Sequence, residues 1–503
     1  MKLKRLIGSC LAMAVFAWGP VAQADDAQLM TLIQGLQKQM SQMQNTIERQ
    51  ESTINQQNDK IAQLAKSGGS ISVAPPAHES KGHKLDEKEV FAKNLKDKIG
   101  DADKWLKGLE TKGDLRLRYE AFQQTSGALT ETDDRNRFRY RLRYEIAKKL
   151  GDQVKVGFGL ASGEAPTASG TSAGSAAVQS DPTSTNTTFD NNFNFKSIYI
   201  NKAYAAYSPN FLKDKGPLKK GTITGGKFSN PFEKGSSDII WDRDVTPEGV
   251  AEQFEFEFLP NSDSAKFGAF ATAGQFVLDE DSSAANSAGD AELYAFQLGI
   301  TPAITIDGIE KPIKLLSALS YYSYHNYAKN SNFTIGGVSL ARGNSNVSGS
   351  ATDLDVADFE VFEFYNEVTF DAFGTPISPF VDWATNLKSA VGDGTGSGAI
   401  GTNEQNAWAF GLKVGNAKKK GEWELGWAYK YIGANAVPGF NDSDFGSSGH
   451  SGKRGNVFKA GYALTDNISL NAAAIFATNL NHGTSTIIDE QQRRFQFDLS
   501  WKF

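Results

Sequence analysis

The sequence has one cysteine, Cys10, and five histidines. Beyond its first two dozen residues it has no apolar run of the roughly 18 residues that a transmembrane helix needs. If cleavage follows Ala24, the mature chain has no thiol, which excludes disulfides, thiolate metal sites and haem attachment through C-x-x-C-H. The H-E-x-x-H, G-x-S-x-G and P-loop patterns are also missing. We therefore expect no enzymatic activity, no cofactor and no bound metal.

The chain has no excess of positive charge either. Its formal net charge is −6, and charged residues make up 22% of it. A nucleic-acid-binding domain usually carries a basic patch or stripe. We therefore expect no nucleic-acid partner.

What is present begins with a secretory signal peptide at residues 1–24. A basic start precedes an apolar run, and Ala22-Gln23-Ala24 supplies an A-x-A cleavage site. A secreted chain without a transmembrane helix is soluble in the periplasm, released, or inserted in the outer membrane as a barrel.

Residues 29–64, within the predicted coiled-coil domain 25–66, carry a heptad pattern with isoleucine or methionine at each a position from Ile33 to Ile61. This pattern predicts a left-handed α-helical coiled coil. The alternative is an amphipathic helix that folds back on its own domain. Residues 67–112 predict a Gly/Ser/Pro linker followed by a short surface helix. We expect this amino-terminal region to be periplasmic.

Residues 135–147 read RNRFRYRLRYEIA, so arginines occupy one face while aromatic and aliphatic residues occupy the other. Strict alternation predicts a β-strand, because successive side chains leave a strand on opposite faces. Strands of soluble sheets have about 5–6 residues, and this one is about twice as long. Its length and its aromatic ends are typical of a transmembrane barrel strand with its charged face toward an aqueous lumen.

Alternating segments recur from residue 113 onward. They predict an all-β fold, a transmembrane antiparallel β-barrel of about sixteen strands over residues 113–503. The predicted strands are 113–122, 134–147, 152–162, 194–207, 220–228, 252–260, 265–278, 289–301, 311–325, 358–371, 375–387, 404–417, 420–432, 453–465, 466–478 and 489–503.

The connections between these strands alternate in length. Those after even-numbered strands are mostly short and those after odd-numbered strands are mostly long, as periplasmic turns and outer loops require. An even strand number places both barrel termini on the periplasmic side. Connections 208–219 and 302–310 are longer than ideal, so about fourteen or about eighteen strands also fit.

Arginines of the first two predicted strands share one face. If that face points inward, they form a cationic wall that suits carboxylate or phosphate groups, because arginine stays charged and offers fixed donors. The predicted pore-lining residues are Arg116, Arg118, Arg135, Arg137, Arg139, Arg141, Arg143 and Lys155. Asp114, Glu120 and Glu145 lie close enough in sequence to neutralise this wall. An arginine wall that selects ions and one that acidic neighbours neutralise therefore fit the sequence equally well.

The long connection 229–251 combines acidic residues with an apolar core at Ile239, Ile240 and Trp241. Such a core indicates that the loop packs against a surface, and the barrel interior offers one. The predicted constriction residues are Asp238, Asp242, Arg243, Asp244 and Glu248. An acidic loop that faces an arginine wall would make a constriction with a transverse field. The alternative is an extracellular loop that packs on its neighbours.

The last predicted strand ends in an aromatic dyad repeat that closes at Phe503. This ending resembles the signal that the outer-membrane assembly machinery reads on barrel proteins. We therefore expect that machinery to be a partner, recognising Phe503.

With these motifs the chain resembles the outer-membrane porins of Gram-negative bacteria that carry an amino-terminal coiled coil. The matching parts are GDLRLRYE at 113–120, DRNRFRYRLRYE at 134–145, GGKFSNPF at 225–232, IIWDRDVTPEGVA at 239–251 and the aromatic C-terminus. The resemblance implies passive diffusion of small hydrophilic solutes or ions through a barrel in outer-membrane lipid, assembled as a homotrimer.

Two other functions fit the same sequence. A barrel sheath could insulate an electron-conducting cytochrome partner that fills the lumen. An envelope tether could contact the cell wall through the coiled coil, with the pore secondary. Copurifying haem without conductance would favour the sheath, and a loosened envelope after deletion of residues 25–66 would favour the tether.

Overall fold

The computed structural model describes the barrel region and leaves several segments undescribed. The described residues are 107–125, 131–164, 181–190, 192–258, 264–280, 290–307, 309–327, 334–335, 338–339, 344, 359–388, 404–446, 450–480 and 491–503. The predicted signal peptide, coiled coil and most of the linker lie outside them. In the described part of the chain, no helix is long and apolar enough to span a membrane.

Sixteen long strands form the barrel. They are β1 Leu109–Thr125, β2 Glu131–Leu150, β3 Val154–Ser162, β5 Ile198–Tyr207, β6 Leu218–Lys227, β7 Glu248–Glu257, β8 Ala265–Asp279, β9 Ala291–Ile304, β10 Ile313–His325, β13 Glu360–Ala372, β14 Thr375–Asn386, β15 Asn406–Gly415, β16 Trp423–Ile432, β17 Lys453–Ala463, β18 Ile468–Asn479 and β19 Gln491–Lys502. The short elements are β4 Thr187–Thr188, β11 Thr334–Ile335, β12 Val338–Ser339 and the 3₁₀ helix η1 Asn210–Leu212. Each predicted strand overlaps one long strand, which confirms the predicted fold and the count of sixteen.

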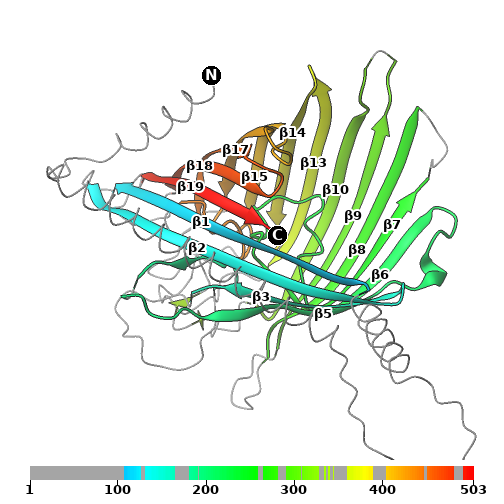
Figure 1. The fold of residues 1–503 in the computed structure, drawn as a ribbon, viewed down its shortest axis with the longest axis horizontal. Helices are drawn as coiled ribbons and strands as arrows, with labels where there is room; N and C mark the ends of the chain where they lie inside the picture. The colour runs from blue at the N-terminus through cyan, green and yellow to red at the C-terminus, as the bar shows by residue number, and fades with distance from the viewer. Residues whose placement is uncertain are drawn as a thin grey trace, which may run out of the picture. The chain divides into compact units, whose positions relative to one another are not determined.

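The sheet closes on itself (Figure 1). Each long strand pairs antiparallel with the next, and β19 returns to β1 with Lys502 opposite Asp114. The backbones of Gly113 and Phe503 exchange hydrogen bonds of 2.6 and 3.0 Å at this seam. Closure leaves the barrel no free strand edge, and a backbone surrounded by lipid requires that.

The strands turn their apolar side chains outward. On β2, Phe138 is 57% exposed whereas the next residue, Arg139, is 8% exposed. On β9, Phe296 and Leu298 are likewise exposed, and Gln297 between them is buried. This pattern is the reverse of a soluble core, and it fits a barrel whose outer face contacts lipid and whose inner face is polar.

The strand boundaries correct two predicted segments. β1 begins at Leu109, so residues 109–112 belong to the barrel and not to the linker. β7 begins at Glu248, so the connection from β6 to β7 covers 228–247 and not 229–251. The chain leaves the loop early because Gly249 and Val250 already pair with Phe276 and Gln275 of β8. We call residues 228–247 the lumen loop.

Candidate functional site: the barrel lumen

The lumen loop packs its apolar side chains on the inner barrel wall. Phe232, Ile239, Ile240 and Trp241 are buried in one cluster with wall residues of β8, β9, β10 and β13. Trp241 donates a hydrogen bond from Nε1 to the Tyr324 hydroxyl at 3.2 Å. Aromatic rings dominate the contact, with Trp241 making edge or tilted contacts to Phe232, Phe276 and Tyr322. The apolar core of this loop is therefore covered by the wall.

Polar anchors fix the lumen loop to the wall at several places. The Ser236 hydroxyl donates to Glu363 Oε1 at 2.6 Å, and the Ser237 backbone N–H donates to Asp382 Oδ2 at 2.9 Å. Asp238 pairs with Lys430 of β16 at 2.6 Å. At the other end of the loop, Asp244 pairs with Arg143 of β2 at 3.1 Å.

These anchors lie on opposite sides of the barrel. In the closed ring of sixteen long strands, β2 and β13 are eight strands apart and thus diametrically opposite. A single loop that bonds to Arg143 on β2 and to Glu363 on β13 must cross the lumen. Its path narrows the space inside the barrel.

Local geometry directs the loop along this path. Asn230 and Asp242 accept hydrogen bonds from backbone N–H groups two residues later, an Asx turn in each case. Gly235 has φ of 84°, and a Cβ there would lie 2.6 Å from the Ala318 Cβ. A side chain at Gly235 would therefore be strained and would push the loop off the wall.

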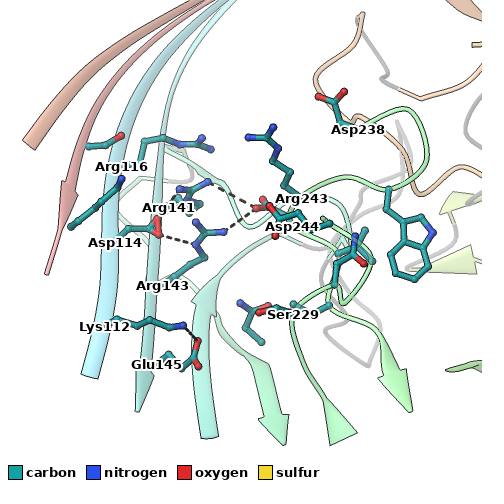
Figure 2. A pocket seen from close by; sticks show the side chains of 18 of the residues that line it. Lys112, Asp114, Arg116, Arg141, Arg143, Glu145, Ser229, Asp238, Arg243 and Asp244 are labelled. Atoms are coloured by element: carbon teal, nitrogen blue, oxygen red, sulfur yellow. Dashed lines mark hydrogen bonds and ion pairs between the residues drawn. The ribbon is translucent and has the colours of Figure 1, made fainter. Parts of the chain in front are cut away.

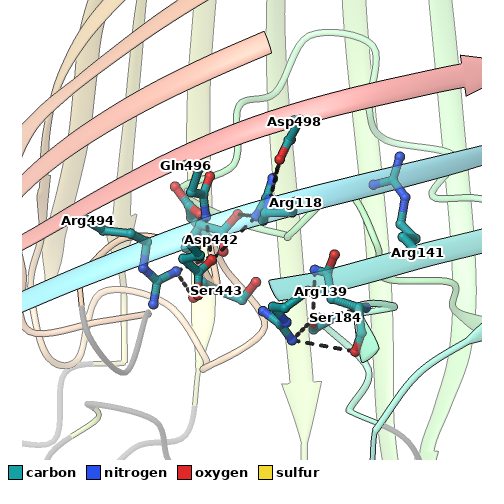
Figure 3. Close-up of polar contacts among 12 residues, drawn as sticks. Arg118, Arg139, Arg141, Ser184, Asp442, Ser443, Arg494, Gln496 and Asp498 are labelled. Atoms are coloured by element: carbon teal, nitrogen blue, oxygen red, sulfur yellow. Dashed lines mark hydrogen bonds and ion pairs between the residues drawn. The ribbon is translucent and has the colours of Figure 1, made fainter. Parts of the chain in front are cut away.

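Four predicted pore-lining arginines contact carboxylates at 3.0 Å or less. Figure 2 shows Arg141 and Arg143 with Asp114 and Asp244, and Figure 3 shows Arg118 with Asp498. The contacts are Arg141–Asp114 at 2.7 Å, Arg143–Asp114 at 2.8 Å, Arg118–Asp498 at 2.7 Å, Arg118–Asp444 at 3.0 Å and Arg137–Glu120 at 2.6 Å. At these positions acidic neighbours balance the arginine charge.

The other predicted pore-lining residues have different surroundings. Arg116 lies 3.6 Å from Asp498 and also donates to Asn186. Arg139 contacts Ser184 and the Asn186 carbonyl instead of a carboxylate. Arg135 is exposed and makes no hydrogen bond or ion pair with a described residue. Lys155 pairs with Glu110 at 2.7 Å, near the first residues of β1.

The predicted constriction residues do not all line the same cavity. Asp238, Asp242, Arg243 and Asp244 lie in the lumen loop and line the same cavity. Glu248 is exposed at the start of β7 and pairs with Lys227 of β6 at 2.7 Å. Glu248 therefore lies apart from this group.

A second loop, residues 433–452, supplies acidic groups that the sequence analysis missed. Asp442 pairs with Lys430, and Asp444 pairs with Arg118 and with Arg494 of β19. A third segment joins them, since the Ser443 hydroxyl donates to the carbonyl of Thr183 at 2.9 Å. Three connections therefore meet beside the β1–β2 arginines.

The anchors Glu363, Asp382 and Lys430 were also missed. Each lies at an inward position of its strand, between two uncharged inward neighbours. That isolation is the one signal that could have found them. Their loop partners are 145 residues distant for Asp382 and 192 for Lys430, which no local pattern reveals.

The three aspartates of the lumen loop differ in their titration. Burial, with Asp244 and Asp442 nearby, raises the pKa of Asp242 well above its ordinary value. Burial also acts on Asp244, but Arg141 and Arg143 outweigh it and lower the pKa. Lys430, Lys459 and Arg243 likewise lower the pKa of Asp238 against burial. The same loop therefore holds two aspartates whose ionised form is favoured and one whose protonated form is favoured.

Open space remains beside the loop. A cavity of about 1040 Å³ is lined by the β1–β2 wall, the opposite wall and the lumen loop. Ten cationic and seven anionic side chains line it: Lys112, Arg116, Arg141, Arg143, Lys202, Lys234, Arg243, Lys413, Lys459 and Lys502, with Asp114, Glu145, Glu233, Asp238, Asp244, Glu367 and Asp498. A second cavity of about 460 Å³ shares Arg116, Arg243 and Lys459 with the first and extends toward Asp442 and Asp444. In the described residues, no group of three or more histidine, cysteine or acidic side chains could hold a metal ion.

A closed sixteen-stranded barrel with an apolar outer face and a charged, partly open lumen defines a transmembrane channel. The family model described as "Putative porin" matches residues 123–360 and 356–503, and the chain belongs to this porin family. A search of curated proteins found no match.

Solved structures of outer-membrane porins are similar in fold. OprB of Pseudomonas putida is 11% identical, with 81% of this chain and 97% of that chain covered at a TM-score of 0.44. The anion-selective porin from Comamonas acidovorans is 12% identical, with coverage of 78% and 99% and a TM-score of 0.40. Salmonella typhi OmpF in complex with daunomycin is 11% identical, with coverage of 78% and 97% and a TM-score of 0.39.

Proposed function

We propose that this porin passes small hydrophilic solutes and ions by passive diffusion, with the lumen loop as its constriction. The observation that carries the proposal is the cavity of about 1040 Å³ between the arginine wall and the loop. Its lining is charged on both sides, so water and polar solutes are accommodated without desolvation of fixed charges. The β1–β2 arginines act as part of this lining.

A cytochrome sheath is a weaker proposal for this barrel. A partner that fills the lumen would have to displace a loop held by Trp241, Ser236 and Asp244. The loop's aromatic contacts and ion pairs would all be lost. The envelope tether concerns residues 25–66, which lie outside the described residues, and deletion of that segment tests it.

We further propose a homotrimer in outer-membrane lipid, with the amino-terminal region in the periplasm. The outward aromatic and aliphatic side chains supply lipid contact. The assembly machinery would recognise the terminal aromatic strand, in which Phe503 stacks near Tyr144 at a ring separation of 6.3 Å. The coiled coil would make the contact with the cell wall.

Single-channel recording in a planar lipid bilayer tests the proposed function. We expect stable conductance from the purified, heat-modifiable protein, with closures in three equal steps if it is a trimer. Copurifying haem and a silent bilayer would overturn the channel and favour the sheath.

A further inference from the structure

Arg243 differs from the other arginines that line the two cavities. It is exposed, it lines both cavities, and Figure 2 shows its side chain projecting into the open space. It makes no hydrogen bond or ion pair with any residue that the structure describes. Its neighbours cannot neutralise it by contact, because Asp244 pairs with Arg143 and Asp242 accepts the N–H groups of Asp244 and Ser443.

A second cation lies near the same point. Lys459 of β17 is 56% exposed, and its closest carboxylate, Asp238, is 4.0 Å away. That carboxylate already pairs with Lys430 at 2.6 Å. Three cations, Lys430, Lys459 and Arg243, therefore act on Asp238, whose single charge cannot balance all of them.

The wall opposite Arg243 adds a further donor. Arg116 also lines both cavities, and its Nε is buried with no hydrogen-bond partner among the described residues. A buried donor without a partner is costly, and an anion in the cavity would supply the missing acceptor. Arg116 of β1, Arg243 of the lumen loop and Lys459 of β17 thus border the same space.

We propose that Arg243 and Lys459 form an oxyanion-binding point that makes this channel prefer anions, with Arg243 as the residue that determines specificity. The inference rests on the proposed function. A guanidinium binds carboxylate or phosphate oxygens through two parallel hydrogen bonds, and an unpaired one keeps both donors available. The paired β1–β2 arginines contribute little, because their charge is balanced by contact with acids.

Reversal potentials in a potassium chloride gradient test this site. We expect the wild-type channel to be more permeable to chloride than to potassium, and Arg243→Gln to lower the permeability ratio about three- to fivefold, as expected for one charge near the ion path. Arg454→Gln is the matched control, because Arg454 is exposed on the outward face of β17. Glu233→Gln should raise the ratio, since Glu233 is exposed in the same cavities without a cationic partner among the described residues.

Two oxyanions distinguish the ligand chemistry. Succinate and inorganic phosphate, added in turn to one side, should each reduce chloride current in the wild type and less so in Arg243→Gln. Reduction by one probe alone assigns the site to carboxylates or to phosphates. An unchanged ratio in Arg243→Gln, with normal conductance, would overturn the inference while leaving the channel intact. A silent wild-type protein would instead overturn the proposed function.

Discussion

Individual charged residues stabilise the lumen through contacts between strands. Glu120 is 0% exposed, accepts a hydrogen bond from Arg137 at 2.6 Å and another from Gln496 of β19 at 3.0 Å. Burying a charge is costly unless it is paired, and removal of one partner leaves the other unbalanced. The inner face of the β19–β1–β2 seam thus depends on complete pairing.

We predict that Glu120→Ala lowers the free energy of unfolding by about 3–5 kcal/mol, because Arg137 loses its carboxylate in a buried setting. Urea titration in lipid vesicles, followed by tryptophan fluorescence, measures the change. Glu110→Ala is the control, since the Glu110 pairs with Lys149 and Lys155 are exposed and should contribute little. Equal losses in both variants would contradict the account.

Protonation of Asp244 and Asp444 at acidic pH should weaken the attachment of the lumen loop and of loop 433–452 to the barrel wall. Burial would raise the pKa of Asp444, but Arg118 and Arg494 lower it well below its ordinary value, and Arg141 and Arg143 lower that of Asp244. A carboxylate whose pKa is lowered by folding stabilises the folded protein at pH values above its unfolded-state pKa, which is near 4. This stabilisation is lost as the pH falls through the folded-state pKa.

We therefore predict quiet single-channel current at pH 7 and flickering current at acidic pH, below the ordinary aspartate pKa of about 4, where the stabilising contribution of these carboxylates is lost. Asp444→Asn should flicker already at pH 7, because its pairs with Arg118 and Arg494 are gone. Current noise that is the same at both pH values would contradict the role of these pairs.

At the scale of elements, the strands were predictable and the lumen loop's attachments were not. Alternation within β2 is visible in thirteen consecutive letters, 135–147, because the pleat alone sets it. The apolar core of the loop, including Trp241, was also visible. The contact of Ser236 with Glu363 was not, since it joins positions 127 residues apart and depends on barrel closure. Arginine positions were therefore predictable from sequence, whereas their partners Asp444 and Asp498 required the fold.

Trp241 is the aromatic anchor of the lumen loop. We predict that Trp241→Ala costs about 3–5 kcal/mol of local stability, as for large core truncations, and lets the loop leave the wall. Single-channel recordings should then show a larger and noisier conductance. Trp423→Ala is the control, because Trp423 is exposed on the outer face of β16 and should leave conductance unchanged. A quiet, unaltered Trp241→Ala channel would count against the loop as constriction.

At the scale of the whole molecule, the closure of the barrel and the constriction of its lumen by the loop depend on each other. The ring of sixteen long strands sets a lumen wide enough for the loop to cross from β2 to β13. The loop in turn connects walls that no direct strand pairing joins. The remaining cavity of about 1040 Å³ is the space through which a solute would pass.

The central claim is that solutes cross the barrel through the cavity beside the lumen loop. Chemical modification of a residue in that cavity tests this claim most directly. Ser229 is exposed and lines the cavity, and Ser264 is exposed in the connection from β7 to β8. In a chain that also carries Cys10→Ala, Ser229→Cys and Ser264→Cys would each supply a single thiol for a charged methanethiosulfonate reagent. We predict that labelling reduces the single-channel conductance of Ser229→Cys and leaves that of Ser264→Cys unchanged. Complete labelling of Ser229→Cys, verified by mass spectrometry, with unchanged conductance would contradict a solute path beside the lumen loop.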